Sequence, residues 1–217
     1  MNLVLLGPPG SGKGTLAKLL SSQLNIPHIS TGDILREEAE SGTSLGKKVK
    51  PFMEKGELVP DQTILEVMKE RIRSSECQKG FLLDGFPRNF HQALELDDML
   101  KNSTKSIDMV IKFDVSDDCV LKRLGGRLIC SGCGADFNRY TKPPQKDLMC
   151  DFCGSQLYQR PDDAQEVILN RLKVYKEQAM PVEKYYNNQG KLRRINAELD
   201  PSLILKNVLN ILQSKKE

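Results

Sequence analysis

The chain lacks long apolar segments and lacks an excess of charge of either sign. No stretch of the sequence approaches the roughly 20 apolar residues of a membrane-spanning helix, so we expect no membrane partner. Lys and Arg number 32 and Asp and Glu number 29, which gives a net charge of +3. This balance argues against a general nucleic-acid or membrane-surface protein, and any positive field that matters must be local.

A targeting signal is also lacking. Residues 1–7 carry no positively charged leader, and their apolar run is far too short for a signal peptide. We therefore expect a cytoplasmic protein whose 6 cysteines are reduced or bound to metal rather than paired as disulfides. The length of 217 residues suits one main domain with a smaller inserted one, and we expect a monomer.

Short apolar runs alternate with helical patterns along most of the chain. We expect strands at residues 3–6, 26–30, 81–83, 109–113 and 192–195, and helices at 13–24, from 31, at 61–72, around 117–124, from 163 and around 205–212. This alternation predicts an α/β fold with a parallel sheet covered by helices on both faces. The long helix is expected to start with Asp163 and Glu166 as a capping box and to end or kink at Pro181.

A glycine-rich loop follows the first expected strand. Residues 7–13 read Gly-Pro-Pro-Gly-Ser-Gly-Lys, which fits a phosphate-binding loop between a strand and a helix. Glycine lets backbone N–H groups approach phosphate oxygens, the helix adds its positive end, and Lys13 adds a point charge. Gly14 stands where a Ser or Thr hydroxyl usually holds Mg²⁺, and Thr15 comes one place later. The spacing and context favour triphosphate binding over a plain glycine-rich turn with a surface lysine.

Arginines favour phosphoryl transfer over hydrolysis. Six of them lie where a charge needs an explanation, namely Arg36, Arg88, Arg123, Arg127, Arg160 and Arg171. Each alone is more often a solvated charge, but Arg88 follows a strand end, where open α/β sheets bind ligands. Guanidinium groups relieve the repulsion between two bound nucleotides during transfer, and a lid is expected to exclude water. A phosphate acceptor needs no general base, in agreement with a chain that has only His28 and His91.

Four cysteines form two pairs in an insertion between residues 127 and 163. Cys130 and Cys133, and Cys150 and Cys153, are C-x-x-C pairs that are each followed by glycine. Their separation suits a four-thiolate zinc site that is structural, because protein fills all four positions. Disulfides and reduced structural thiols are the alternatives. A nucleic-acid-binding ribbon is disfavoured because acidic residues offset the basic ones, so we expect no nucleic-acid partner.

The motifs together are similar to those of one family. They are residues 7–15, Ser-Thr-Gly-Asp at 30–33, Gly-Phe-Leu-Leu-Asp-Gly-Phe-Pro-Arg at 80–88, the two cysteine pairs, and Tyr-Gln-Arg-Pro-Asp-Asp at 158–163. On these motifs the chain resembles adenylate kinase, in the long-lid form with a zinc-binding lid, over essentially its whole length. The Gly14-Thr15 order is the family's own version of the loop.

The resemblance implies a P-loop fold of three layers, a parallel sheet flanked by helices, with a small zinc-ribbon-like lid and a helical AMP-binding segment. It implies a core of residues 1–29, 60–126 and 164–217, an AMP-binding segment of 30–59 and a lid of 127–163. The implied reaction is reversible, Mg²⁺-dependent transfer of the γ-phosphoryl group of ATP to AMP, giving two ADP, in nucleotide homeostasis. Mg²⁺ would accompany ATP, and Zn²⁺ would be structural.

The resemblance also implies roles for individual residues. The predicted catalytic residues are Lys13, Arg88, Arg123, Arg160 and Arg171, with Asp84 holding Mg²⁺ through water. The predicted ATP-binding residues are Gly10, Ser11, Gly12, Lys13, Gly14, Thr15, Arg127, Asp136, Phe137 and Leu199. The predicted AMP-binding residues are Thr31, Arg36, Glu57, Leu58, Val59, Gly85, Phe86, Pro87, Arg88, Gln92, Arg160 and Arg171. Asp162 and Asp163 would help to lock the closed lid.

Two rival functions are left open. The nearer is a sibling enzyme that uses GTP as donor, since few side chains are expected to read the donor base. The other is a nucleotide-dependent switch or ATPase whose insertion contacts a partner. The arginines and the acceptor-side motif argue against a switch, because a switch needs no second nucleotide pocket.

Overall fold

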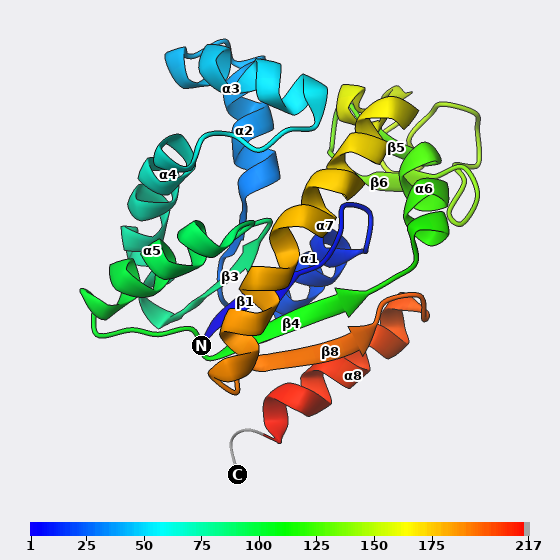
Figure 1. Ribbon diagram of the computed structural model, residues 1–217. Helices are drawn as coiled ribbons and strands as arrows, with labels where there is room; N and C mark the ends of the chain where they lie inside the picture. Colours follow the sequence, from blue (N-terminus) through cyan, green and yellow to red (C-terminus); the bar gives the residue numbers. More distant parts are fainter. Residues whose placement is uncertain (215–217) are drawn as a thin grey trace.

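The computed structural model of the chain describes residues 1–214 (Figure 1). Its centre is a five-stranded sheet in the order β2-β3-β1-β4-β8, in which all neighbouring strands are parallel. The strands are β1 (Asn2–Leu6), β2 (His28–Ser30), β3 (Phe81–Asp84), β4 (Met109–Asp114) and β8 (Leu192–Asn196). The predicted α/β fold with a parallel sheet is confirmed.

Helices cover both faces of this sheet. They are α1 (Lys13–Leu24), α2 (Thr31–Glu40), α3 (Ser44–Lys55), α4 (Asp61–Arg73), α5 (Phe90–Lys101), α6 (Asp117–Gly125), α7 (Gln165–Asn188) and α8 (Pro201–Gln213). Short 3₁₀ helices span Ser75–Lys79 and Pro161–Asp163. None of the helices within residues 1–214 has both the length and the apolar character to cross a membrane.

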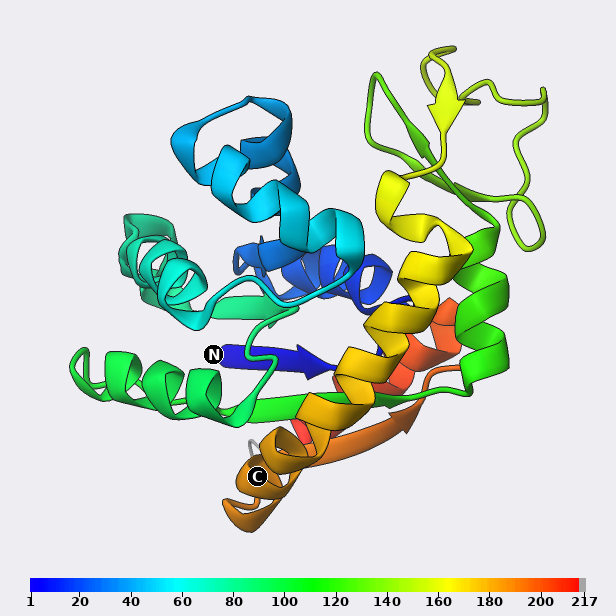
Figure 2. The ribbon, with the colours of Figure 1, turned by 45° about the horizontal axis from the view of Figure 1, so that its top comes forward.

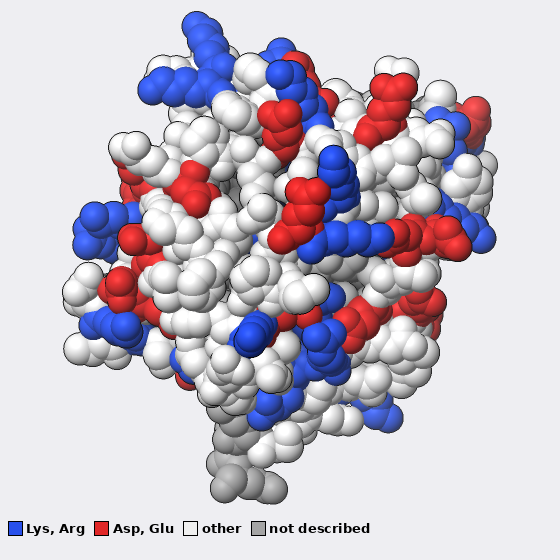
Figure 3. Space-filling model, viewed as in Figure 1, with Lys and Arg blue, Asp and Glu red and all other residues white. Residues whose placement is uncertain are grey.

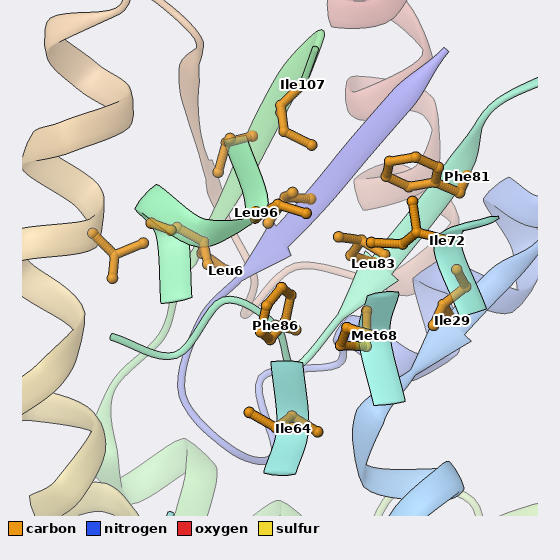
Figure 4. Close-up of a cluster of buried hydrophobic side chains, with 14 of the residues drawn as sticks. Leu6, Ile29, Ile64, Met68, Ile72, Phe81, Leu83, Phe86, Leu96 and Ile107 are labelled. Carbon is orange, nitrogen blue, oxygen red and sulfur yellow. The ribbon is translucent and has the colours of Figure 1, made fainter. Parts of the chain in front are cut away.

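The alternation of side chains along β1 divides the core into two layers. Val4 and Leu6 belong to a cluster with buried side chains of α4, α5 and α7, whereas Leu3 and Leu5 pack with α1 and α8. Figure 4 shows the first cluster, in which Leu83 of β3 lies among side chains of α4 and α5. Both faces of the sheet are therefore buried, as a parallel sheet requires.

The insertion forms a separate small sheet. Strands β5 (Arg127–Cys130), β6 (Asp136–Asn138) and β7 (Leu157–Tyr158) pair antiparallel in the order β6-β5-β7. A core of its own includes Leu128, Phe137 and Leu157. Figures 1 and 2 show the insertion beside the first turns of α7, across from α2 and α3.

The capping box expected at the start of α7 is wrong, and so is an end at Pro181, one of the two outcomes expected there. The helix begins after Ala164, not Asp163, because the carboxylate of Asp163 accepts hydrogen bonds from Arg127 instead of capping the helix. The helix also does not end at Pro181 but continues to Asn188. Beyond the proline it buries Val182 and Tyr186 in the core, and this packing offsets the lost backbone hydrogen bond.

Candidate active site

The carboxyl ends of the parallel strands open onto one cleft of about 930 Å³. Its walls include Gly7 after β1, Asp84 at the end of β3 and Phe113 in β4. The insertion adds Arg127 to the wall, and the segment that contains α2 adds Arg36. Because open α/β sheets bind ligands at this edge, the cleft is the candidate active site.

The glycine-rich loop lies between β1 and α1 at the floor of the cleft. Gly10 and Gly12 have positive φ angles of 74° and 94°, and a Cβ on Gly10 would lie 2.7 Å from Leu124 Cγ. The N-cap Gly12 offers no side-chain hydrogen bond to α1, so the N–H groups of the first turn point to an anion as their partner. Lys13 Nζ donates to the carbonyl oxygens of Gly7 and Pro8, at 2.8 Å each.

Burial shifts the titration of Lys13. Desolvation, together with the neighbouring cations Arg88 and Arg171, lowers the pKa of Lys13 to about 8, although Asp84 opposes this shift. Keeping Lys13 protonated in this cleft therefore costs free energy. A bound polyanion would stabilise the protonated form.

Gly14 lies beside Asp84. A Cβ on Gly14 would lie 3.4 Å from the Oδ2 atom of Asp84, at the limit of ordinary contact. His28 Nε2 lies 3.5 Å from the same oxygen. In the usual form of this loop a Ser or Thr side chain projects from the position of Gly14. Here the carboxylate of Asp84 lies next to that position.

Besides Arg36 and Arg127, four arginines line the cleft, and they come from separate parts of the chain. Arg88 follows β3, Arg123 lies in α6, Arg160 precedes the 3₁₀ helix and Arg171 lies in α7. Burial lowers the pKa of Arg88, Arg160 and Arg171, in the last case to about 10, and nearby guanidinium groups add to each shift. Arg88 is open to the water of the cleft while protein surrounds its other sides. Guanidinium groups are cations at neutral pH, so the cleft concentrates positive charge.

This concentration is local. On the face shown in Figure 3, Lys and Arg are interspersed with Asp and Glu, in keeping with a net charge of only +3.

Ion pairs join the base of the insertion to the neighbouring helices. Asp163, whose side chain is fully buried, accepts from Arg127 Nε at 2.7 Å and lies 3.4 Å from Arg171 Nη1. Asp162 Oδ2 lies 3.1 Å from Arg171 Nη1 and 3.5 Å from Arg36 Nη1. The two carboxylates thus hold arginines from three elements beside the cleft.

Most predicted site residues line the cleft. These are Gly10, Ser11, Gly12, Lys13, Gly14, Thr15, Arg36, Leu58, Asp84, Gly85, Pro87, Arg88, Arg123, Arg127, Asp136, Phe137, Arg160, Arg171 and Leu199. Placement alone does not assign their roles, which stay predictions.

Five predicted acceptor-side residues are not among the lining residues, namely Thr31, Glu57, Val59, Phe86 and Gln92. Glu57 is exposed and the other four are buried. Thr31 Oγ1 donates to the carbonyl oxygen of Gly85 at 2.9 Å, and Gln92 Oε1 accepts from the backbone N–H of Arg88 at 2.8 Å. In this conformation Thr31 and Gln92 therefore support the wall of the cleft.

Two lining lysines were missed. Lys18 forms an ion pair with Asp136 at 3.0 Å, which connects α1 to the insertion. Lys142 Nζ lies 5.2 Å from the ring centroid of Phe137, within range of a cation–π contact. Helical spacing places Lys18 one turn after Gly14, so it was predictable, whereas nothing local marks Lys142.

The four cysteines of the insertion converge. Their Sγ atoms all lie within 4.8 Å of one another, with 3.4 Å between Cys130 and Cys153 and 3.6 Å between Cys133 and Cys150. Tetrahedral zinc thiolates at about 2.3 Å from the metal would have sulfurs about 3.8 Å apart, so the donor set fits zinc. The glycines after the pairs, Gly134 and Gly154, have φ of 67° and 73°, as the predicted left-handed turns require. All four cysteines are free of disulfides, so the disulfide alternative is wrong.

Comparison with known proteins identifies the family. A family model described as adenylate kinase matches residues 5–191. The chain belongs to the adenylate kinase family. Adenylate kinases from Thermosipho africanus and Archaeoglobus fulgidus are 48% and 47% identical, over 98% and 100% of this chain and 100% of each relative. One from Methanocella arvoryzae is 51% identical over 91% of this chain and 92% of its own length.

Membership of the adenylate kinase family makes the chain a nucleoside monophosphate kinase, a phosphotransferase that binds nucleotides. The resemblance predicted from the sequence motifs is confirmed. The phosphate loop, the arginines and the insertion thus belong to one kinase architecture.

Proposed function

We propose that the chain transfers the γ-phosphoryl group of Mg²⁺-bound ATP reversibly to AMP, giving two ADP, and so maintains nucleotide balance. The observation that carries this proposal is the continuous cleft, which has the phosphate loop on its floor and arginines from four separate elements around it. A hydrolase needs one polyanion site, whereas a cluster of this extent suits two.

The phosphate loop would hold the donor. Backbone N–H groups of residues 10–15 and the ammonium of Lys13 would bind the β- and γ-phosphates at the start of α1. Arg127, Asp136, Phe137 and the backbone near Leu199 line the same cleft and would hold the rest of ATP. Mg²⁺, held through water by Asp84, would neutralise phosphate charge when bound.

The acceptor would lie on the opposite side, near Arg36 and Arg88. The backbone of residues 57–59 and 85–87, with Thr31 and Gln92, would enclose AMP. Because Thr31 and Gln92 are buried in this conformation, we expect the segment at 30–59 to move when AMP enters. Asp162 and Asp163 would stabilise the closed lid, since they already pair with Arg127, Arg171 and Arg36.

Transfer itself would depend on charge stabilisation. Lys13, Arg88, Arg123, Arg160 and Arg171 would orient the phosphoryl group and balance the charge that spreads over its oxygens. The acceptor phosphate is already ionised, so no side chain needs to remove a proton. Closure of the lid would exclude water and prevent hydrolysis of the donor.

The chain would divide into a core, an AMP-binding segment at residues 30–59 and a lid at residues 127–163. Zinc, held by the four cysteines, would stabilise the fold of the lid. We further propose that the chain acts as a monomer, because a single chain supplies both sides of the cleft, and that it acts in the cytoplasm, where cysteines stay reduced.

A coupled assay for ADP tests the proposal. ATP plus AMP should yield two ADP for each AMP consumed, and ATP alone should yield almost no phosphate. Steady phosphate release from ATP alone, without ADP formation that depends on AMP, would contradict the proposal and favour an ATPase. Replacing ATP with GTP in the same assay tests the sibling enzyme, and equal or faster rates with GTP would favour it.

A further inference from the structure

Asp61, the first residue of α4, is the hub of a hydrogen-bond network at the acceptor side. Its Oδ1 accepts from Gln92 Nε2 at 2.7 Å and from Asn89 Nδ2 at 2.8 Å, and its Oδ2 lies 3.0 Å from His91 Nδ1. Asn89 is also the N-cap of α5 and accepts from the backbone N–H of Gln92. One carboxylate therefore connects the start of α4 with the start of α5.

The network fixes which way round the Gln92 amide lies. The backbone N–H of Arg88 can only donate, so it must meet Oε1 of Gln92. The carboxylate of Asp61 can only accept, so it must meet Nε2. Although partial burial opposes it, hydrogen bonds from Gln92, Asn89 and His91 lower the pKa of Asp61, which keeps the carboxylate ionised.

The Gln92 side chain is held almost fully inside the protein, since the residue is only 2% exposed. A primary amide has two N–H groups and two oxygen lone pairs, and these two bonds use one of each. The second lone pair of Gln92 Oε1 and the second N–H of Gln92 Nε2 therefore have fixed places. A ligand must present a donor to Oε1 and an acceptor to Nε2.

We propose that Asp61 is a positioning residue that makes the acceptor site selective for adenine over guanine, by holding the Gln92 amide in one orientation. This inference rests on the proposed function, in which Gln92 meets the acceptor base. Adenine presents an amino donor beside a ring-nitrogen acceptor, whereas guanine presents a carbonyl acceptor beside an N–H donor. Guanine would therefore need the amide to turn over, which would set Nε2 against the N–H of Arg88 and Oε1 against Asp61.

Kinetics of acceptor choice test the proposal. The ratio of kcat/KM for AMP to kcat/KM for GMP is measured with ATP as donor. Asp61→Ala should lower this ratio about tenfold or more, as expected for loss of a two-point contact to a base edge, mainly through a higher KM for AMP. In Asp61→Asn, the donor Asn89 Nδ2 should hold the new amide oxygen in the place of Oδ1, so that it still accepts from Gln92 and the ratio stays within about threefold. Glu66→Ala removes an exposed carboxylate from the same helix and is the matched control.

A double-mutant cycle separates positioning from a merely structural role of Asp61. If Asp61 acts through Gln92, Asp61→Ala should not change the ratio further in the Gln92→Ala background. The proposal would be overturned if Asp61→Ala lowered the AMP-to-GMP ratio equally in the wild-type and Gln92→Ala backgrounds, or lowered it in neither. If Asp61→Ala does not fold, Asp61→Ser replaces it, because a hydroxyl both donates and accepts and no longer fixes the amide.

Failure of the proposed function would look different. A wild-type protein that forms no ADP from AMP would contradict the kinase proposal itself. A wild-type protein that prefers AMP, with an unchanged ratio in Asp61→Ala, would contradict only the role of Asp61.

Discussion

At the scale of single residues, the cleft keeps cations where water solvates them poorly. Lys13 illustrates this, because desolvation lowers its pKa to about 8, whereas an exposed lysine titrates near about 10.4. The cation binds phosphate, and in the empty site it loses its proton as the pH rises through about 8. Binding of ATP would restore the proton by raising the pKa again.

The pH dependence of kcat/KM for ATP reports the enzyme before ATP binds. At saturating AMP, kcat/KM should fall as the pH rises above about 8, because the deprotonated form of Lys13 accumulates. In contrast, kcat should fall only at a higher pH, since bound phosphates hold the proton. Initial rates between about pH 6 and pH 10 provide the check, and a kcat/KM that stays constant well above pH 8 would refute it.

Arg171 is the subject of the second prediction. Arg171→Ala should lower kcat about 100-fold, or about 2.7 kcal/mol, the scale expected when one group that stabilises transition-state charge is removed. Arg171→Lys should recover part of this loss, because it keeps the charge but not the fork of donors. Arg73→Ala, in an exposed position at the end of α4, is the control. Equal rates for Arg171→Ala and the control would remove Arg171 from the mechanism.

Sequence motifs marked Lys13 and Arg88 because local spacing defines them. They did not mark Asp61 or Lys112, which have partners in distant parts of the chain, or Lys142, whose contact with Phe137 depends on the fold of the insertion. Lys112, for example, is 7% exposed and lies 3.4 Å from Glu183 of α7. Such pairs depend on how the elements pack, which one sequence does not reveal.

At the scale of elements, the base of the lid is stabilised by Asp163. Asp163→Asn would leave Arg127 and Arg171 without their fully buried carboxylate partner. We expect the free energy of unfolding to fall by about 3 kcal/mol, and the Tm to fall by about 6–12 °C for a chain of this size. Asp147→Ala, at an exposed position of the insertion, should change the Tm little. Calorimetry checks the prediction, and equal melting temperatures for both variants would contradict it.

Periodicity predicted the five strands of the central sheet and most helices, but it did not predict the strands of the insertion or the helices α3 and α5. Helix α3 contains Gly46 and Pro51, which both disfavour helix, although Thr43 and Gly56 cap its ends. Gly46 is needed because a Cβ there would lie 1.9 Å from the carbonyl oxygen of Glu38 in α2. Close packing of α2 on α3 thus overrides local propensity. Pro181 does not end α7 for the same reason, since core packing extends the helix beyond it.

At the scale of the whole molecule, the sheet, the lid and the helical segment bring charge to a single cleft while the total charge stays near zero. The lid has its own small core, and we expect it to depend on metal for the rest of its stability. The division into a core, an AMP-binding segment and a lid is still a prediction. Movement of the three parts as separate units when nucleotides bind would support this division.

Zinc content tests the role of the lid cysteines. We expect close to one equivalent of zinc per chain by elemental analysis. Cys130→Ala and Cys153→Ala should lose the metal and lower the Tm, while kcat below the melting range stays within about threefold, because the site is structural. Cys119→Ala, which lies outside the cluster, is the control. Unchanged zinc content and Tm in the cluster variants would contradict a structural metal site.

The central claim is that the cleft passes a phosphoryl group between two nucleotides. The most direct test follows the label from ATP carrying ³²P in its γ-phosphate, in the presence of AMP and Mg²⁺. The proposed transfer predicts that the label appears in the β-phosphate of newly formed ADP, with almost none in inorganic phosphate. Label found mainly in inorganic phosphate, with AMP unconsumed, would contradict it.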